Sequence, residues 1–369
     1  MSTHNRRTTV LLLGARGYVG SVLLERILQH PYIDTVYASS DSAEGRYIAS
    51  DFPLITEQQM QKLASKTYIS THALYTQELA HACTAIFSAL PHGVLAKHIQ
   101  AFLPNTKPSN TLASHSKEST CIIDLSGDFR LKNSEVYAEY YRTEHPNPSL
   151  LAKATYGLSE WYRHDIQHAT IIANPGCYPT ATLLPMLPIL RTSTIQGLIH
   201  ITAITGISGA GRTQDSNFLF CERNENISAY KSGIQHRHVP EIQQEIKNLG
   251  GASDVEVVFT PHLAPISSGM YCSIMLALPS RAESIRAREA LYAQYLAEPF
   301  VSVIDSDSNS QYHGTLHVRN SNHAIINTRC EDNCILLHCM IDNLWKGAAG
   351  QALQNFNIRF GYEEWAGLT

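Results

Sequence analysis

The stretch that decides the fold is TTVLLLGARGYVG, Thr8–Gly20. Its first part, Thr8–Leu13, is a β-branched and aliphatic run that predicts a strand, and Ser21–His30 beyond it has helical periodicity. Between them the glycines follow the spacing G-x-x-G-x-x-G, which lets backbone N–H groups approach a pyrophosphate at the start of a helix. The commoner spacing is G-x-G-x-x-G, but the position directly after the first strand favours a dinucleotide turn over an ordinary tight turn. We expect this turn to bind a cofactor through Gly14, Arg16, Gly17, Tyr18, Val19 and Gly20.

The rest of the N-terminal half continues this alternation of strands and helices. Further strand candidates are Thr35–Ser40, Ala85–Ala89 and Cys121–Leu125, with a helix near Val94–Phe102 between the last two. The polar segment Pro104–Thr120 predicts a surface loop. Such alternation is typical of a mostly parallel, doubly wound sheet, which we expect to end near residue 173.

The pattern changes in the second half. Long, partly alternating strand candidates with longer connections indicate a mostly antiparallel sheet with helices on one face. These candidates are Gly197–Thr205, Val255–Thr260, Met270–Leu278 and Cys334–Ile341, and helices are expected over Ala282–Ala297 and Leu344–Asn355. The chain is therefore predicted to be an α/β protein with a Rossmann-type dinucleotide-binding domain and an α+β catalytic domain. The predicted limits are 1–173, 174–341 and, for a C-terminal helix that returns to the first domain, 342–369.

The composition excludes several classes of protein. Of the 369 residues, 44% are hydrophobic and 16% are charged, which is typical of a folded globular chain rather than a disordered one. The net charge of -4 and the lack of a basic stretch argue against nucleic acid and anionic membranes as partners. Met1–Thr9 is polar, and Val10–Leu13 is too short for a signal sequence or a membrane span, so we expect a cytoplasmic location.

The cysteines do not suggest a disulfide framework or a metal site. All 8 are scattered and most lie inside apolar runs, a pattern that favours free thiols. Cys330, Cys334, His338 and Cys339 lie near one another, but their spacing fits no common zinc pattern. No metal is therefore expected.

The end of the second strand, where a cofactor's ribose 2′ position is read, carries mixed signals. An acidic residue there favours NAD, whereas a basic residue with hydroxyl groups favours NADP. Ser39, Ser40 and Arg46 favour the phosphorylated cofactor, and Asp41 favours NAD. These residues alone leave the choice open.

Cys177, in the segment NPGCYPT at Asn174–Thr180, is the strongest candidate for a nucleophile. It follows Pro175-Gly176 and precedes an apolar segment, Thr180–Leu190, that is expected to be helical. Near a helix N-terminus, the dipole and the unbonded N–H groups favour the thiolate, which is the reactive form of cysteine. The same N–H groups can stabilise an oxyanion. The alternative is that Cys177 is an ordinary buried core residue.

A base must come from elsewhere in the chain, and His236-Arg237-His238 is the best candidate. One imidazole can exchange a proton with Cys177 and with a substrate oxygen. The guanidinium of Arg237 suits a carboxylate or a phosphate. The alternative for this segment is a solvated basic turn without a catalytic role.

Together these motifs resemble one known family, the N-acetyl-gamma-glutamyl-phosphate reductases of arginine biosynthesis. The resemblance covers almost the whole chain and rests on separated motifs in the family's order. They are GARGYVG (14–20), ALPHG (89–93), DLSGDFR (124–130), YGLSE (156–160), NPGCYPT (174–180), SGAGR (208–212), HRHVPEI (236–242), TPHLAPISSGM (260–270) and DNLWKGAAGQALQN (342–355). Aspartate-semialdehyde dehydrogenases and glyceraldehyde-phosphate dehydrogenases share the cysteine and histidine logic, but less of this set.

The resemblance implies reduction of an acyl phosphate through a covalent intermediate. Cys177 would attack N-acetyl-glutamyl phosphate and expel phosphate to leave a thioester, which hydride from NADPH would reduce towards the semialdehyde. The family's acid/base histidine falls on His238, directly before the VPEI segment, with His236 as the alternative. Substrate-binding residues are expected at Asn174, His236, Arg237 and the two arginines that close glycine-bearing polar motifs, Arg130 and Arg212. Further cofactor-binding residues are expected at Ser88, Pro91, His92, Gly93, Ser208, Gly209 and Asn343.

Three positions depart from the commoner family pattern. Gly127 and Ser159 stand where alanine and proline are expected, and Asp41 stands where a basic residue is more usual. Two other functions compete with the leading one: an aspartate-semialdehyde dehydrogenase, with the same chemistry on a shorter substrate, and a nucleotide sensor without catalysis. A sensor would not need both Cys177 and the histidine pair. The sequence leaves open whether the glutamyl amine carries an acetyl group or a carrier protein, and the resemblance implies a homo-oligomer, dimer or tetramer.

Overall fold

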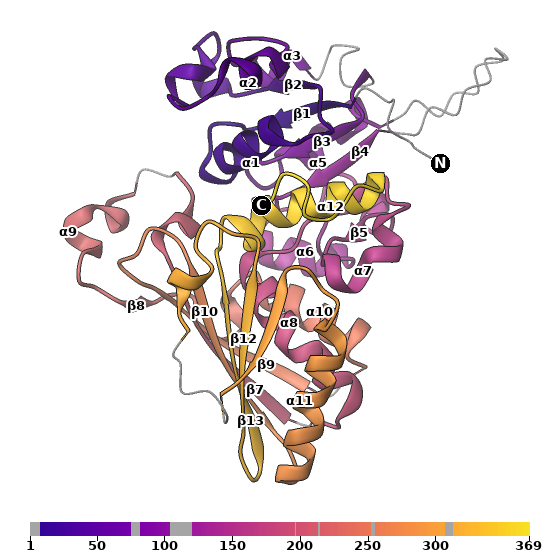
Figure 1. Cartoon of the computed structure of the whole chain (residues 1–369), viewed down its shortest axis with the longest axis vertical. Coiled ribbons are helices and arrows are strands. Elements are labelled where there is room, and N and C mark those ends of the chain that lie inside the picture. The colour runs from indigo at the N-terminus through magenta and orange to yellow at the C-terminus, as the bar shows by residue number, and fades with distance from the viewer. Residues whose placement is uncertain are drawn as a thin grey trace, which may run out of the picture. The chain divides into compact units, whose positions relative to one another are not determined.

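The computed structural model describes residues 8–74, 82–103, 120–195, 197–212, 215–251, 255–306 and 313–369 (Figure 1). The chain divides into two compact units. Unit 1 comprises residues 1–132, 145–174 and 352–369, and unit 2 comprises residues 133–144 and 175–351. Of the loop predicted over Pro104–Thr120, residues 104–119 lie outside the described segments.

Unit 1 is built on a six-stranded sheet in which all neighbouring strands run parallel, in the order β2-β1-β3-β4-β6-β5. The strands are β1 Thr9–Leu13, β2 Thr35–Ala38, β3 Ala85–Ser88, β4 Cys121–Asp124, β5 Thr155–Tyr156 and β6 Ile171–Ala173. Every residue of β3 and β4 is buried, the pattern of central parallel strands covered on both faces. The strand order reverses between β1 and β3, and ligands of such sheets bind at the carboxyl ends of strands at this point.

Short helices connect these strands: α1 Tyr18–Gln29, α2 Glu57–Lys62, α3 Thr71–Leu74, α5 Val94–His98 and α7 Ser159–Ile166. The last helix of the chain, α12 Gly350–Phe360, lies almost entirely in this unit. Helix α1 begins before the predicted Ser21 because the N–H of Ser21 already bonds to the carbonyl of Gly17, at 2.7 Å. The helix predicted near Val94–Phe102 is instead α5 followed by a separate 3-10 turn, Ile99–Ala101.

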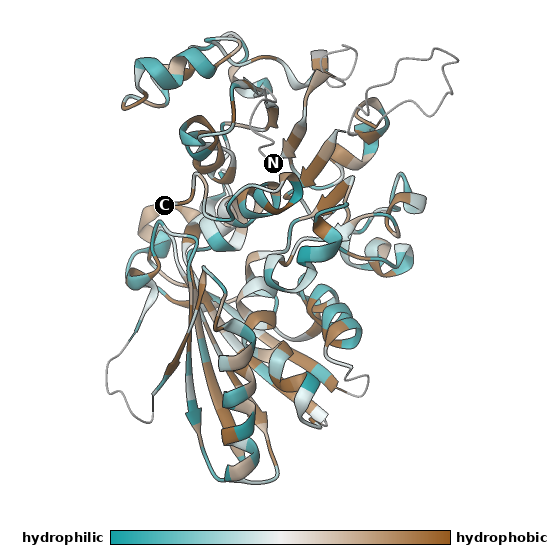
Figure 2. Cartoon of the chain, turned by 45° about the vertical axis from the view of Figure 1, so that its right-hand side comes forward, coloured by the Kyte–Doolittle hydropathy of each residue, from teal (hydrophilic) through white to brown (hydrophobic). Residues whose placement is uncertain are grey.

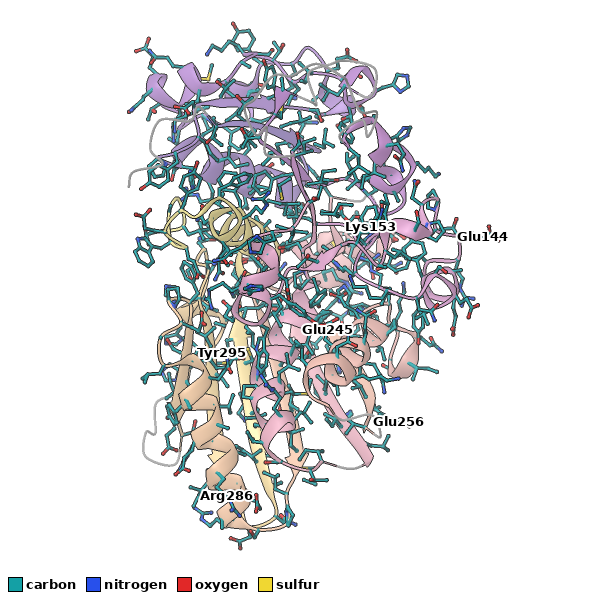
Figure 3. All side chains as sticks on the ribbon, turned by 90° about the vertical axis from the view of Figure 1, so that its right-hand side faces the viewer. Glu144, Lys153, Glu245, Glu256, Arg286 and Tyr295 are labelled. Carbon is teal, nitrogen blue, oxygen red and sulfur yellow. The ribbon has the colours of Figure 1, made fainter. Side chains whose placement is uncertain are left out.

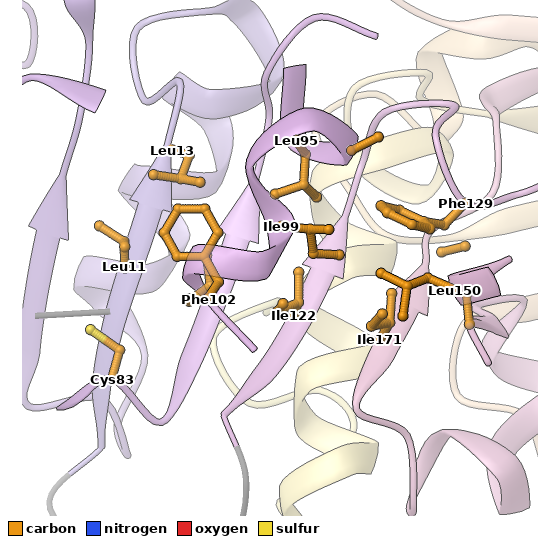
Figure 4. Packing of buried hydrophobic residues seen from close by; sticks show 14 of the residues in the cluster. Leu11, Leu13, Cys83, Leu95, Ile99, Phe102, Ile122, Phe129, Leu150 and Ile171 are labelled. Atoms are coloured by element: carbon orange, nitrogen blue, oxygen red, sulfur yellow. The ribbon is translucent and has the colours of Figure 1, made fainter. Parts of the chain in front are cut away.

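An apolar cluster holds α5 and the 3-10 turn against the sheet (Figure 4). Leu95, Ile99 and Phe102 are fully buried among strand residues that include Leu11 and Ile122. Each such side chain contributes about 1.5–3 kcal/mol by leaving water. This packing fixes the loops at the carboxyl ends of β3 and β4.

Unit 2 contains a seven-stranded sheet in the order β11-β12-β13-β10-β7-β9-β8. The strands are β7 Gly197–Thr205, β8 Ser228–Ala229, β9 Val255–Leu263, β10 Met270–Ala277, β11 Val301–Asp305, β12 Ala324–Cys330 and β13 Cys334–Ile341. The pairs β7–β9 and β11–β12 are parallel, and the other pairs are antiparallel. The predicted fold class, a parallel Rossmann-type sheet followed by a mostly antiparallel one, is thus confirmed.

Three helices of unit 2 pack on this sheet: α8 Cys177–Thr192, α10 Val239–Leu249 and α11 Arg281–Tyr295. Helix α8 contacts both α10 and α11. Helix α8 is buried all round from Tyr178 to Leu190 and packs on β10 and β13, so its position is set by the core. The hydroxyl of Tyr295, labelled in Figure 3, donates to the carbonyl of Leu184 in α8 at 2.6 Å. Figure 2 shows hydrophobic residues along the strands of both sheets, as expected for sheets that form cores.

The C-terminal helix begins differently from the prediction. Trp345–Ala349 forms a π-helical turn, and regular α-helix starts at Gly350 and runs to Phe360. Within the described segments, no helix is long and apolar enough to cross a membrane. The 8 cysteines, all of which are described, form no disulfide.

Candidate active site

Cys177 is the first residue of α8, with Gly176 as its N-cap. The helix therefore begins three residues before the predicted Thr180, whose N–H already bonds to the carbonyl of Gly176 at 3.0 Å. Cys177 is partly exposed, whereas the helix behind it is buried. A thiol at this end of a helix faces the positive end of the dipole and the first unbonded N–H groups, which favour its thiolate.

The turn before Cys177 is held by α10. The carboxylate of Glu241, which is 1% exposed, accepts a hydrogen bond from the backbone N–H of Gly176 at 2.8 Å. His238 is the N-cap of the same helix, so one helix end presents both the histidine and the carboxylate to the cysteine turn. The imidazole of His238 lies directly over Gly176: a Cβ added to that glycine would be 2.6 Å from Nε2.

His236 is a neutral ring with a fixed proton. Burial, reinforced by the charges of Arg237 and Lys231, lowers the pKa of His236 to about 3, so this ring is neutral at physiological pH. Its Nδ1 accepts a hydrogen bond from the backbone N–H of His238 at 3.1 Å. The single proton of the neutral ring therefore sits on Nε2, which makes His236 a fixed donor.

Aromatic rings hold His236 in place. Its ring lies edge-on to Phe259 and to Tyr178, with centroids 5.3 and 5.5 Å away. The hydroxyls of Tyr178 and Tyr230 are 3.0 Å apart and form a hydrogen bond. Such packing limits the rotamers of the imidazole and keeps its N–H aimed in one direction.

A cavity of about 470 Å³ opens at Cys177, and both histidines line it. Its wall also includes the cationic side chains of Arg223, Lys231 and Arg237. Within the described part of the chain no carboxylate lines it. A cavity of this size, with three cations beside a thiol, suits a small molecule with more than one negative charge.

The predicted substrate-binding residues are distributed unevenly. Cys177, His236, Arg237 and His238 line one cavity, whereas Arg212 is exposed and is not part of its wall. Arg130 belongs to unit 1, where its Nε donates to the carbonyl of Asn174 at 2.8 Å and its Nη2 to that of Leu125 at 2.9 Å.

Asn174 is the last residue of the 145–174 segment of unit 1 and is held on several sides. Its side-chain Oδ1 accepts from Nδ2 of Asn355 at 3.1 Å, and its backbone N–H donates to Asp124 at 2.8 Å. Asn355 also donates to the carbonyl of Gly157 at 2.8 Å. This network fixes the chain immediately before the Pro175-Gly176-Cys177 turn.

The glycine turn of unit 1 has the backbone that a dinucleotide requires. Gly14 has φ +75, and a Cβ there would lie 2.7 Å from the carbonyl oxygen of Ala89, so only glycine fits. Gly17 caps α1 and leaves the first N–H groups of that helix available for a phosphate. At the end of β3 the hydroxyl of Ser88 is fully buried and has no hydrogen-bond partner among the described residues. The cofactor-binding role of these positions stays a prediction.

The loop after β3 is held by hydrogen bonds with the loop after β4. Nδ1 of His92 accepts from the N–H of Gly127 at 2.7 Å, and the N–H of Gly93 donates to Asp128 at 2.6 Å. Pro91, between them and the strand, is exposed. In unit 2, Nδ2 of Asn343 donates to Ser208 at 3.0 Å, and Gly209 lines the cavity.

Near the end of β2, the two carboxylates Asp41 and Asp51 have different partners. The carboxylate of Asp41 accepts from the N–H of Thr71, at the start of α3, at 2.7 Å. Arg16 and Arg46 both contact the carboxylate of Asp51, at 2.9 and 2.8 Å. Desolvation opposes ionisation of Asp51, but the hydrogen bond from Arg16 and the charges of both arginines lower its pKa. Ser39 bonds to the Thr71 hydroxyl at 2.9 Å, and Ser40 is buried 3.3 Å from the hydroxyl of Ser42.

Sequence reasoning missed four residues of the site: Glu241, Arg223, Lys231 and Tyr230. Glu241 lies inside a quoted motif but contacts Gly176 across 65 positions, which no local pattern reveals. The other three lie in a segment without motifs. Among the described residues, no cluster of histidine, cysteine or acidic residues could hold a metal.

Comparison with known proteins defines the class first. A family model described as "Semialdehyde dehydrogenase, NAD binding domain" matches residues 9–169, and one described as "Semialdehyde dehydrogenase, dimerisation domain" matches residues 177–343. The protein is thus of the semialdehyde dehydrogenase class, with a nicotinamide-binding domain and a domain for self-association.

Closer relatives define the family. N-acetyl-gamma-glutamyl-phosphate reductase of Rhodopirellula baltica is 34% identical over 100% of this chain and 99% of its own. That of Geobacter metallireducens is 36% identical over 97% of each chain. The chain belongs to the N-acetyl-gamma-glutamyl-phosphate reductase family, as its motifs predict.

Solved structures agree on the fold. Aspartate semialdehyde dehydrogenase II of Vibrio cholerae, complexed with ASA, has a TM-score of 0.69 at 15% identity and covers 97% of this chain and 99% of its own. The aspartate semialdehyde dehydrogenase of Candida albicans, solved with NADP, has a TM-score of 0.63 at 16% identity, with coverage of 96% and 98%. At these identities the likeness concerns the fold alone.

Proposed function

We propose that this protein reduces N-acetyl-glutamyl phosphate to N-acetyl-glutamate semialdehyde and phosphate, with NADPH as the reductant. The observation that carries the proposal is the placement of Cys177 at the first position of α8, in one cavity with His238 and three cations. A thiol nucleophile, a proton carrier and a strongly cationic wall are what a doubly charged acyl phosphate requires.

The chemistry follows from the position of each group. The Cys177 thiolate attacks the acyl carbon, and the N–H groups at the start of α8 stabilise the oxyanion that forms. Phosphate leaves, and Cys177 carries the acyl group as a thioester. When bound, a nicotinamide cofactor would supply the hydride for reduction of this acyl group. His238 accepts the proton of the thiohemiacetal hydroxyl as the carbon–sulfur bond breaks and Cys177 leaves as the thiolate.

The acid/base role belongs to His238 rather than His236. His238 lies over Gly176, beside the nucleophile. His236 is kept neutral, and its Nδ1 is already engaged by the His238 N–H. Its remaining Nε2–H group donates a hydrogen bond to the substrate but does not cycle a proton. Arg237 binds the phosphoryl group, and Arg130 braces Asn174 at the start of the nucleophile turn.

NADP is the cofactor that the 2′ region favours. The negative charge of Asp41 is turned towards the N-terminus of α3 and is bonded to the Thr71 N–H. Two guanidinium groups, Arg16 and Arg46, gather at one point beyond β2 and the glycine turn. A 2′-phosphate matches two arginines better than a ribose hydroxyl does. Unit 1 therefore serves as the nucleotide-binding domain and unit 2 as the catalytic domain.

The protein associates with copies of itself through the sheet of unit 2. The side chains of β10 are buried on one face of that sheet and more exposed on the other. The more exposed face carries apolar residues, among them Leu198, which is 65% exposed, and Met275, which is 51% exposed. The match to a dimerisation domain over 177–343 supports a second copy as the partner. Light scattering on the wild type and on Met275→Glu measures the mass directly, and an unchanged mass would exclude this face.

The reaction itself is tested in reverse. N-acetyl-glutamate semialdehyde, phosphate and NADP⁺ should give NADPH, whereas aspartate semialdehyde should give little. Turnover with the aspartate compound alone would refute the proposed substrate. Cys177→Ser should bind substrate but lose turnover, and activity in that variant would refute the covalent route.

A further inference from the structure

Arg223 is one of the three cationic side chains of the cavity, and the reaction described above gives it no separate role. It is the last residue of the short helix α9, Phe220–Arg223, and its side chain lines the same cavity as Cys177. Its Nη1 donates to the hydroxyl of Ser228 at 2.9 Å. Its Nε is fully buried and has no hydrogen-bond partner among the described residues.

A buried guanidinium N–H without an acceptor is unfavourable unless a ligand supplies one. In arginine, the Nε–H and one N–H of Nη2 point the same way and match the two oxygens of a carboxylate. Arg163 uses this edge in the same chain, where Nε and Nη2 donate to the two oxygens of Glu364 at 2.7 and 3.3 Å. In Arg223 the third nitrogen, Nη1, is fixed by Ser228, which orients the guanidinium group, and no described residue accepts from Nε.

We propose that the Nε/Nη2 edge of Arg223 binds the α-carboxylate of the substrate and selects for it. This inference rests on the proposed function, because it assumes an amino-acid-derived acyl phosphate. The phosphoryl group must lie next to the carbon that Cys177 attacks, close to His238 and to Arg237 in the same segment. Arg223 comes from a different segment, and a planar fork matches a planar carboxylate better than a tetrahedral phosphate.

The reverse reaction separates the two anions, because the carboxylate enters on the semialdehyde and phosphate enters as a second reactant. In Arg223→Gln, KM for N-acetyl-glutamate semialdehyde should rise roughly 10- to 100-fold, as expected for a lost charged hydrogen bond. KM for phosphate should change less than about twofold, since no phosphate contact is lost. Arg223→Lys should recover part of the loss, because lysine keeps the charge but not the fork.

The matched control is Arg286→Gln, at an exposed arginine on α11 that Figure 3 labels. It should leave the KM values for the semialdehyde and for phosphate unchanged. A second measurement does not depend on the variant folding. The wild type should strongly prefer the semialdehyde over its α-carboxamide analogue, and Arg223→Gln should lose most of that preference.

The outcomes separate the two proposals. A wild type inactive on N-acetyl-glutamate semialdehyde would refute the proposed function. An active wild type with KM for phosphate raised in Arg223→Gln, and KM for the semialdehyde unchanged, would overturn the role of Arg223. Equal use of the carboxylate and the carboxamide by the wild type would overturn it as well.

Discussion

Glu241 accepts a hydrogen bond from the backbone N–H of Gly176, 2.8 Å away, and so ties the helix that carries His238 to the turn that carries Cys177. The carboxylate is buried, and no motif links the two residues across 65 positions of sequence. The pair helps to set the distance between Cys177 and His238, the proposed nucleophile and proton carrier, before any substrate arrives. Preorganisation of this kind is what a covalent mechanism needs.

Replacement of Glu241 should therefore be felt at Cys177. Glu241→Ala leaves a buried N–H without its acceptor, which costs about 1–3 kcal/mol, and should lower both kcat and the alkylation rate of Cys177 roughly tenfold or more. Glu241→Gln keeps a carbonyl acceptor and should retain most of both. Iodoacetamide labelling followed over pH 5–9 makes the comparison, in a Cys221→Ser background because Cys221 is exposed. An unaltered labelling profile in Glu241→Ala would contradict the coupling.

Gly347 should tolerate no side chain. A Cβ at this position would lie 2.8 Å from Cβ of Cys177, closer than real side chains approach. Gly347→Ala must displace the cysteine, and displacements of that order lower rates about 100-fold. Gly314→Ala is the matched control, since nothing lies within 4 Å of its added Cβ. The two variants should differ in kcat while their melting temperatures stay close; similar kcat values would count against the prediction.

The histidine assignment predicts two different pH profiles. Because burial lowers the pKa of His236 to about 3, that ring does not titrate between pH 5 and 9. His236→Asn should lower kcat/KM at every pH without changing the shape of the profile. His238→Asn should lower kcat about 100-fold or more and remove one limb of the profile. The opposite pattern would assign the proton to His236.

His30 should make unit 1 sensitive to acid. Its ring is fully buried, and burial lowers its pKa to about 4, against an opposing hydrogen bond with Asn357 at 2.8 Å. The folded state therefore disfavours the protonated ring: the stability is complete above pH 6.5, the unfolded value, and falls as pH drops towards 4. At pH 5 the loss is about 2 kcal/mol. Urea unfolding at pH 7.5 and pH 5 measures this loss. The free energy of unfolding should fall less between the two pH values in His30→Gln than in the wild type. In His168→Gln, at an exposed histidine, it should fall as much as in the wild type.

Arg16 and Arg46 should set cofactor preference. Arg46→Gln should raise KM for NADPH roughly tenfold and leave KM for NADH nearly unchanged, because NADH has no 2′-phosphate to lose. The double variant with Arg16→Gln should go further. Arg329→Gln, at an exposed ion pair with Glu331, is the control. Equal losses for both cofactors would show that the arginines bind the shared pyrophosphate instead.

Much of the fold could be predicted because its signals are local. Thr9–Leu13 is an almost wholly apolar strand, and the glycine at position 14 permits the positive φ that the turn after it takes. Strand β12, Ala324–Cys330, escaped prediction because Asn327, Thr328 and Arg329 interrupt its apolar pattern, and only pairing with β11 and β13 makes it a strand. Strand β8 has two residues and exists only through its pairing with β9.

The residues of the candidate site likewise fall into those that local sequence predicts and those that only the folded chain brings together. Cys177 and the two histidines could be predicted because their neighbours in sequence are unusual. The partners that give them direction could not, since Glu241 acts across the chain and Arg223 is recognisable only by a buried Nε without an acceptor. The difference between His236 and His238 likewise depends on burial and one backbone hydrogen bond, not on residue type.

The Asp51 carboxylate has a thermodynamic consequence for the cofactor. Arg16 and Arg46 already share this resident counter-ion, so the 2′-phosphate of the proposed cofactor would enter by ion exchange rather than by filling a bare cationic site. Only the difference in free energy between the two partners would then contribute to affinity. Under the same proposal, Asp51 would keep both guanidinium groups aligned between turnovers and would compete with the oxidised cofactor for them.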